Sequence, residues 1–255
     1  MRVWLHEWKG NEWGWNAWSL DHTGFATWAP TRDEVLLRVP GKFDEYQQWL
    51  ARHGCGTVEA GAAPGHITVV EEVSGNEVLF EHDLVPATSD EIAECLRLLS
   101  YSRQDLVATV EGLPDSVLDW DPPYRQFAEW ARWRTIRQII EHIALTEVGY
   151  YLPAIGYSGP DPTSLVGAGV EWREQLLRSR RETERFLTQL ASSHDRARVT
   201  RGEEEWSVRK VLRRLVRHEL LHWKSIRRIV RDYNDQGYPS ISHAYPDTPH
   251  QRVGS

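Results

Sequence analysis

The chain has 255 residues, of which 40% are hydrophobic and 26% charged, and its formal net charge is −7. This composition is typical of a globular protein and gives no reason to expect nucleic acid as a partner. No apolar run approaches the roughly 20 residues of a membrane helix, and the start, MRVWLHEWKG, lacks the apolar core of a signal peptide. We therefore expect a cytoplasmic protein without a membrane partner. Its two cysteines, Cys55 and Cys95, form no disulfide framework.

The first 86 residues are typical of a small α+β unit. Short runs rich in β-branched and aromatic residues alternate with turns, and six of the 13 tryptophans lie before residue 29. Strands are expected around 13–15 and 25–28. Two more strands, over 67–73 and 77–84, are expected to pair around the turn at 74–76.

A helix is predicted between these two pairs of strands. Thr31 and Glu34 have the spacing of a capping box, which favours a helix beginning here. Proline lacks a backbone N–H, so we expect Pro40 to interrupt this helix, which then ends by His53.

Beyond residue 86 the hydrophobic pattern changes to the helical period. Thr88 and Glu91 form a second capping box and predict a helix over 89–111. Three further helices are expected over 135–152, 169–191 and 207–234. The predicted fold class is therefore α+β: a small sheet-and-helix domain (1–86), a four-helix bundle (87–234) and an irregular tail (235–255).

Three histidines point inward when the predicted helices are drawn at about 100° per residue. His222 lies in the middle of the apolar stripe of its helix, and His218 lies beside it one turn earlier. On the helix over 135–152, His142 shares its face with Thr146 and Gly149, which are small enough to leave space beside the imidazole. The basic residues from 209 to 231 fall on the opposite side of their helix and are expected to form a solvated face, paired with the acidic surplus elsewhere in the chain.

Three inward imidazoles favour a metal site. A buried polar group without a partner costs about 1–3 kcal/mol, and one cation satisfies all three rings at once. Histidines four residues apart on one helix can converge on the same ion, and three protein ligands leave a position open for chemistry. Zinc, nickel and iron all suit such a site, and the ligands alone do not choose between them.

The string RHELLH contains the H-E-x-x-H signature of zinc proteases, so a metalloprotease is an alternative. One form of that signature needs glycine at 225 and histidine at 228, where this chain has Ser225 and Arg228. The other form needs a glutamate on a later helix, and no glutamate follows Glu219. A protease is therefore the weaker interpretation.

Two segments carry a resemblance to a known family: WRTIRQIIEHIALTE in the helix over 135–152 and EWSVRKVLRRLVRHELLH at 205–222. They resemble the DinB-like (DinB/YfiT-like) metalloenzyme superfamily over about residues 87–234. The resemblance implies a four-helix bundle with a long crossover between its second and third helices. It also implies that His142, His218 and His222 bind a divalent metal.

The family includes S-transferases and isomerases that use low-molecular-weight thiols, so the resemblance implies a metal-dependent enzyme that activates a thiol or water, with a small-molecule substrate and a thiol cosubstrate. Arg103 is the candidate for holding an anionic substrate group, and Tyr150 and Thr146 are weaker candidates for the pocket wall. Glu219 is the candidate for contacting a ligand histidine on the side of its ring that faces away from the metal. The sequence is compatible with a homodimer but does not require one.

An alternative is a metal-binding scaffold or protein-interaction module without catalysis. Exposed tryptophans in the first domain would favour it, because aromatic side chains anchor interfaces; tryptophans that fill a thin core would not. The segment FATWAPTRDEVLLRVPGKFDEYQQWLARHG resembles HicB-like folds, and from that resemblance we expect only the fold.

Overall fold

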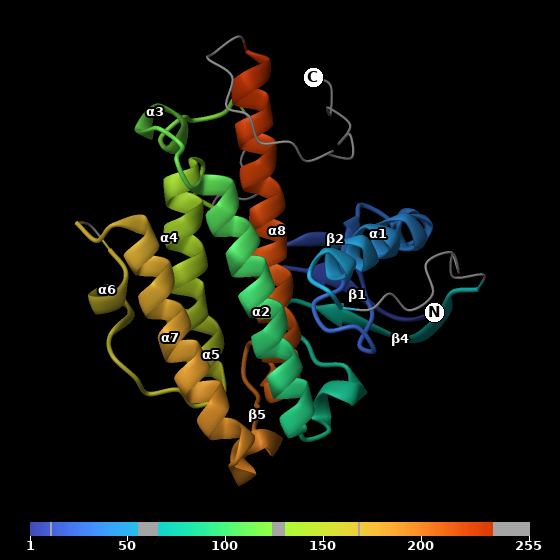
Figure 1. The fold of residues 1–255 in the computed structure, drawn as a ribbon. Helices are drawn as coiled ribbons and strands as arrows, with labels where there is room; N and C mark the ends of the chain where they lie inside the picture. Colours follow the sequence, from blue (N-terminus) through green and yellow to red (C-terminus); the bar gives the residue numbers. More distant parts are fainter. Residues whose placement is uncertain (11, 56–65, 124–130, 168, 237–255) are drawn as a thin grey trace.

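The computed structural model describes residues 1–10, 12–55, 66–123, 131–167 and 169–236 (Figure 1). A small sheet with one helix packs beside four long helices, so the fold class is α+β as predicted. The predicted tail begins at residue 235, and from residue 237 onward it lies outside the described residues. No helix in the described ranges is both long and apolar enough to cross a membrane.

The N-terminal sheet has four strands in the order β3-β2-β1-β4. The central strand β1 pairs antiparallel with β2 and parallel with β4, and β2 pairs antiparallel with β3. The strands expected around 13–15, 25–28 and 67–73 are present. Their bounds are Arg2–Lys9 (β1), Trp13–Trp18 (β2), Ala26–Ala29 (β3) and Thr68–Gly75 (β4).

Helix α1 (Arg32–Arg52) connects β3 to the segment before β4 and runs through Pro40 without a break, so the predicted interruption is wrong. Thr31 caps the helix by accepting a hydrogen bond from the Glu34 amide. An internal proline costs about 3 kcal/mol. Burying a large apolar side chain contributes about 1.5–3 kcal/mol, so one buried face outweighs that cost. The side chains of that face are Val35, Val39, Phe43, Tyr46 and Trp49.

The second strand of the expected pair, over 77–84, does not form. After β4 the chain leaves the sheet and makes a short 3-10 turn at Glu81–Leu84. Asp83 stabilises this turn by accepting a hydrogen bond from the Phe80 amide, and its carboxylate also pairs with Arg213 on the last helix. The charge of Asp83 is thus satisfied across the molecule, which a strand on the sheet would not allow.

Four helices form the bundle: α2 (Ser89–Val110), α4 (Ile136–Thr146), α7 (Trp172–Ala191) and α8 (Val208–Asp235). Helices α2 and α8 run in one direction and α4 and α7 in the other (Figure 1). Each pair of like direction packs side by side, so the chain must cross the length of the bundle between α4 and α7. The expected long crossover is present and carries α5 (Leu152–Ala154) and α6 (Pro162–Leu165).

Smaller elements complete the bundle. Helix α3 (Asp115–Leu118) joins α2 to α4, and a 3-10 turn at His194–Ala197 follows α7. The two-residue strands β5 (Val199–Thr200) and β6 (Trp206–Ser207) pair just before α8. The predicted capping box at Thr88 with Glu91 is seen, and Thr135 with Gln138 forms a further one at the start of α4.

The helix predicted over 135–152 contains a π turn at Glu147–Tyr151. A π turn fits an extra residue into the helix, so the side chains after Thr146 are rotated relative to a regular helix. Gly149 is consequently exposed and a Cβ there would contact Pro162 rather than lie beside His142. The predicted role of Gly149 as space beside the imidazole is therefore wrong.

The basic face of α8 packs against the N-terminal part of the chain, so the prediction of a solvated face is wrong, whereas the expected pairing with acidic residues elsewhere is present. Lys210 and Arg213 are buried, and they pair with Glu77 and Asp83, which follow β4. The Arg213 guanidinium also lies 4.5 Å from the ring centre of Trp18. Charges and tryptophans therefore join the sheet to the bundle.

The tryptophans of the N-terminal part mostly fill its interior. Trp4, Trp8, Trp18 and Trp49 are buried, whereas Trp13 is 54% exposed. On β1, Val3 and Leu5 belong to the main apolar cluster with the buried face of α1. Trp49 belongs to the same cluster, whereas Trp4 and Trp18 form a second cluster with Ala26 and Phe80. Most of these tryptophans are therefore buried, which removes the main support for an interaction module built on exposed tryptophans.

Candidate metal centre

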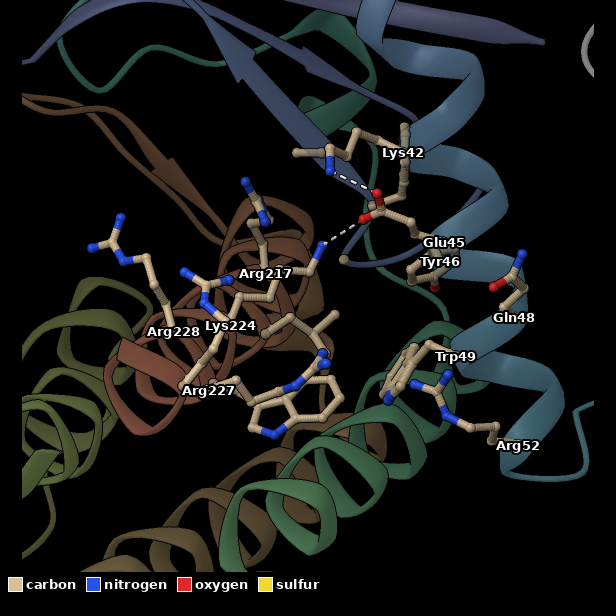
Figure 2. Close-up of a pocket in the computed structure, with 16 residues that line it drawn as sticks. Lys42, Glu45, Tyr46, Gln48, Trp49, Arg52, Arg217, Lys224, Arg227 and Arg228 are labelled. Atoms are coloured by element: carbon tan, nitrogen blue, oxygen red, sulfur yellow. Dashed lines mark hydrogen bonds and ion pairs between the residues drawn. The ribbon is translucent and has the colours of Figure 1, made fainter. Parts of the chain in front are cut away.

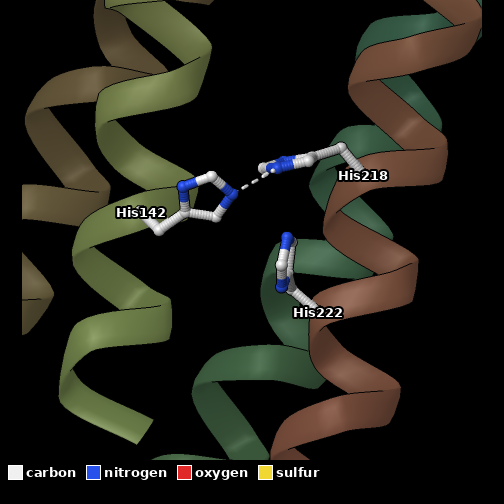
Figure 3. A group of neighbouring side chains, drawn as sticks. All are labelled: His142, His218 and His222. Carbon is white, nitrogen blue, oxygen red and sulfur yellow. Dashed lines mark hydrogen bonds between the residues drawn. The ribbon is translucent and has the colours of Figure 1, made fainter. Parts of the chain in front are cut away.

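Three histidines from two helices converge inside the bundle (Figure 3). His142 projects from α4. His218 and His222 both project from α8, where they lie one turn apart. One ligand atom from each ring lies within 4.8 Å of the other two. The Nε2 atoms of His142 and His218 are 3.0 Å apart and share a hydrogen bond. The predicted convergence of these three residues is therefore present in the structure.

The surroundings of the histidines fix the orientation of their rings. The Thr146 hydroxyl and Nδ1 of His142 share a hydrogen bond of 3.2 Å, one turn along α4. The indole of Trp133 stacks on the His142 ring with centres 3.4 Å apart and meets His222 edge-on at 5.7 Å. Tyr151 packs edge-on against His218 at 5.5 Å. The cluster thus has aromatic walls and one hydroxyl beside it.

Burial keeps the three imidazoles neutral. Loss of hydration lowers the pKa of His142 to about 4. Burial, reinforced by the neighbouring histidines, also holds the pKa values of His218 and His222 well below the usual range. At neutral pH each ring therefore has a lone pair, which is the state that a metal ion requires of a histidine ligand.

The donor set fits a divalent transition metal. Nitrogen ligands about 2.0–2.1 Å from a tetrahedral zinc ion lie about 3.3 Å from one another. The Nε2 atoms of His142 and His218 are 3.0 Å apart, and all three ligand atoms lie within 4.8 Å of one another. In addition, Nδ1 of His222 is buried and has no hydrogen-bond partner among the described atoms. Figure 3 shows the outer nitrogen of His222 turned toward the other two rings, so its Nε2, rather than this Nδ1, would face a shared ion.

A closed ring of four charges lies at the centre of the bundle, with one residue from each long helical segment. Arg103 of α2 pairs with Glu147 of the π turn and with Glu219 of α8, at 3.1 and 2.6 Å. Arg180 of α7 pairs with the same two carboxylates. Two positive and two negative groups cancel, so this ring can be buried without a net charge.

Two of the predicted site residues, Glu219 and Arg103, belong to this ring of charges. Both carboxylate oxygens of Glu219 accept hydrogen bonds from arginines, and the carboxylate accepts none from a ligand histidine in the described structure. The expected support of a histidine by Glu219 is therefore replaced by Thr146, whose hydroxyl contacts His142. Arg103 donates to Glu219, Glu147 and the Leu176 carbonyl, and its role in holding a substrate anion stays a prediction.

Tyr150 lies away from the ring of charges, on the exposed side of the π turn. Its hydroxyl donates to the Glu204 carboxylate at 2.9 Å, and its ring meets Trp206 edge-on. Burial by these neighbours raises the pKa of the Tyr150 hydroxyl. Its role as a pocket wall stays a prediction.

The sequence did not point to Trp133, Tyr151, Glu147 or Arg180 as parts of this region. Trp133 precedes the first residue of α4, so no helical wheel places it. Tyr151 and Glu147 lie in the π turn, where the regular helical period fails. Arg180 could have been found, because it lies on the same helix face as the buried Leu176 and Thr183, where an arginine needs a carboxylate partner.

Comparison with known proteins places the chain in a family. The family model of the DinB superfamily matches residues 98–226, which are half of the chain and include all three histidines. This chain belongs to the DinB superfamily. The match also includes the four residues of the charged ring. It begins after the N-terminal sheet, so the likeness of that sheet to HicB-like folds stays a prediction.

One solved structure resembles this DinB superfamily member: YfiT from Bacillus subtilis, described as a probable metal-dependent hydrolase with an unusual four-helix bundle topology. The two chains are 18% identical, and the match covers 62% of this chain and 95% of YfiT with a TM-score of 0.45. No curated protein sequence matches this chain.

Proposed function

We propose that this member of the DinB superfamily is a divalent-metal-dependent enzyme whose ion is held by His142, His218 and His222. The observation that carries the proposal is the convergence of three buried or half-buried imidazoles from two helices. An ion between the rings gives their desolvated nitrogens a common partner, which offsets the cost of burying them. Two of the three ligands come from the turn of α8 that also carries Glu219.

A bound divalent ion would lower the pKa of a coordinated water toward about 7 or ionise a coordinated thiol. The chain's own residues prepare for this chemistry. Trp133 and Tyr151 restrict water around the rings, and Thr146 holds the His142 ring in one orientation. Three protein ligands leave room for a substrate or a nucleophile.

We further propose that the nucleophile is a low-molecular-weight thiol and the substrate a small electrophile. With a chlorinated aromatic, the thiol sulfur would form a carbon–sulfur bond, the carbon–chlorine bond would break, chloride would leave with the bonding electrons, and the thiol proton would pass to solvent. Hydrolysis of a small substrate is the second form of the proposal, and it uses water in place of the thiol.

The first test is metal content. Protein purified without a histidine tag should contain close to one equivalent of zinc, nickel or iron by elemental analysis. The double variant His218→Ala/His222→Ala should lose it. The matched control is His194→Ala, which removes an exposed histidine in the turn after α7. Equal metal in all three proteins would contradict the proposal.

The second test is turnover. The metal-loaded protein is incubated with a mycothiol or bacillithiol mimic and a panel of electrophiles, and in parallel with ester and amide substrates without thiol. Metal-dependent product in either arm supports an enzyme and chooses between thiol and water. Stoichiometric metal without turnover in either arm would favour a metal-binding scaffold instead.

The protease alternative is not supported by the contacts of Glu219. A protease of the H-E-x-x-H type needs this carboxylate as a general base at the metal. Here its two oxygens accept hydrogen bonds from Arg103 and Arg180 at the centre of the bundle.

A further inference from the structure

A second site lies between α1 and α8, in a groove of about 150 Å³ that we call the cationic groove (Figure 2). Seven of the described residues that line it are lysine or arginine, and Glu45 is the one carboxylate among them. Lys42 and Lys224 both pair with Glu45, at 2.7 and 3.6 Å. The groove therefore concentrates positive charge in a chain whose net charge is −7.

Arg217 is the main evidence that the groove is built for a ligand. Its guanidinium makes no hydrogen bond or ion pair with any described residue, and it is partly buried. By contrast, the next two arginines toward the start of α8, Arg213 and Arg214, each pair with a buried carboxylate.

The walls of the groove suit a small molecule. Trp49 and Tyr46 of α1 and Trp223 and Leu220 of α8 give it an apolar side. The indole N–H of Trp49 donates to Asp105, and that of Trp223 donates to Thr109. Each ring is therefore fixed by a hydrogen bond to a residue that does not line the groove. Its volume equals the share of about five water molecules in the liquid, which suits a phosphate with a few carbon atoms.

The cationic groove is separate from the candidate metal centre. Counting about 100° per residue along α8, Arg217 and Lys224 lie roughly 140–160° from His222. The histidines face α4, whereas the groove faces α1 (Figures 2 and 3). A ligand in the groove would thus contact the side of α8 that is opposite to the histidines.

We propose that the cationic groove binds a small phosphomonoester, with Arg217 and Lys224 contacting the phosphate and the aromatic walls contacting its carbon body. Arginine suits this role because its planar guanidinium donates two parallel hydrogen bonds to phosphate oxygens. The proposal does not depend on the metal centre, because none of the three histidines lines the groove.

The test measures binding and stability together in the full-length protein. Glycerol phosphate and inorganic phosphate are titrated by calorimetry, and thermal unfolding is followed with each ligand and with sodium chloride of equal ionic strength. Both phosphates should raise the unfolding midpoint more than chloride does. The same titration with the His142→Ala variant should give unchanged binding, which separates the groove from the metal centre.

The decisive variant is Arg217→Gln. It should weaken phosphomonoester binding at least tenfold and, without ligand, unfold at a higher temperature than the wild type, because it removes a partly buried cation that has no partner. A merely structural arginine would give the opposite shift in midpoint. The matched control is Arg181→Gln, which removes one charge from the exposed side of α7 and should change neither quantity.

Three results would overturn the proposal. One is an equal effect of phosphate and chloride on unfolding. Another is phosphomonoester binding by Arg217→Gln that matches the wild type. The third is sedimentation with phosphatidate vesicles in the absence of any binding to dissolved glycerol phosphate, because that would assign the groove to a lipid surface.

Discussion

The guanidinium of Arg180 on α7 is bonded to the carboxylate of Glu219 on α8 across the centre of the bundle. Glu219 stands between two candidate metal ligands in the sequence, yet its side chain joins the charged ring. Since Arg103 and Glu147 complete the ring, removing one member leaves an uncompensated charge in the interior.

Glu219→Gln should therefore destabilise the protein by about 3–5 kcal/mol, the usual cost of breaking a buried ion pair. The double variant Arg180→Met/Glu219→Gln restores the balance of charge, and it should be more stable than Glu219→Gln alone. Urea unfolding of the metal-free proteins measures both effects. A cost below about 1 kcal/mol for Glu219→Gln would show that the ring is not intact in solution.

Removing the Thr146 hydroxyl should weaken metal binding more than it weakens the fold. A group that orients a ligand histidine typically contributes 10- to 100-fold to metal affinity. Thr146→Val keeps the volume of the side chain but loses its hydrogen bond with His142, whereas Thr146→Ser keeps the hydroxyl. Competition with a chelator should show a drop of about tenfold or more for valine and little change for serine. Equal affinities in the two variants would contradict this role.

The metal-free protein should lose stability as the pH falls from about 6.5 toward 4. Burial lowers the pKa of His6 and of His142 to about 4 in the folded protein, whereas both titrate near 6.5 when unfolded. Between these values the unfolded state binds more protons, so acid favours unfolding. Above about pH 6.5 both imidazoles are neutral in the folded and in the unfolded protein, and their stabilisation of the fold is fully present.

Each histidine of this kind contributes up to about 1.4 kcal/mol per pH unit. The slope is measured by urea unfolding between pH 7.5 and 5.5, where ordinary carboxylates stay ionised. His6→Gln should reduce the slope, while His194→Gln, at an exposed position, should leave it unchanged. A stability that does not change over this interval would rule out buried neutral histidines.

Glu77 should be essential for joining the sheet to the bundle. It is buried after β4 and pairs with both Lys210 and Arg214 of α8. Glu77→Gln leaves two cations without their partner and should cost about 3–5 kcal/mol. Glu72→Gln breaks the half-exposed pair with Arg32 and should cost less than about 1 kcal/mol. Equal unfolding midpoints for the two variants would contradict this difference.

The bundle and its histidines were predictable because local signals and periodicity agree there. Thr88 and Thr135 cap the helices that the sequence predicts, and the inward phase of His142, His218 and His222 follows from segregation of apolar and charged residues. The convergence of the three rings needs only that two amphipathic helices bury their apolar faces against each other.

The errors arise where distant contacts outweigh local preference. Pro40 stays inside α1 because the helix buries one face against the sheet, and residues 77–84 leave the sheet because Asp83 pairs with Arg213. The basic face of α8 looks solvated in the sequence because its carboxylate partners lie more than 100 residues earlier in the chain. No periodicity reveals such pairs.

Helix α8 presents histidines to α4 on one side and arginines to α1 and the sheet on the other. An insertion or deletion of a single residue within Val208–Asp235 would turn everything beyond it by about 100° about the helix axis. Related chains that share this architecture should therefore vary in side chains along α8 but not in its length, and gaps in their alignment should gather in the crossover between α4 and α7.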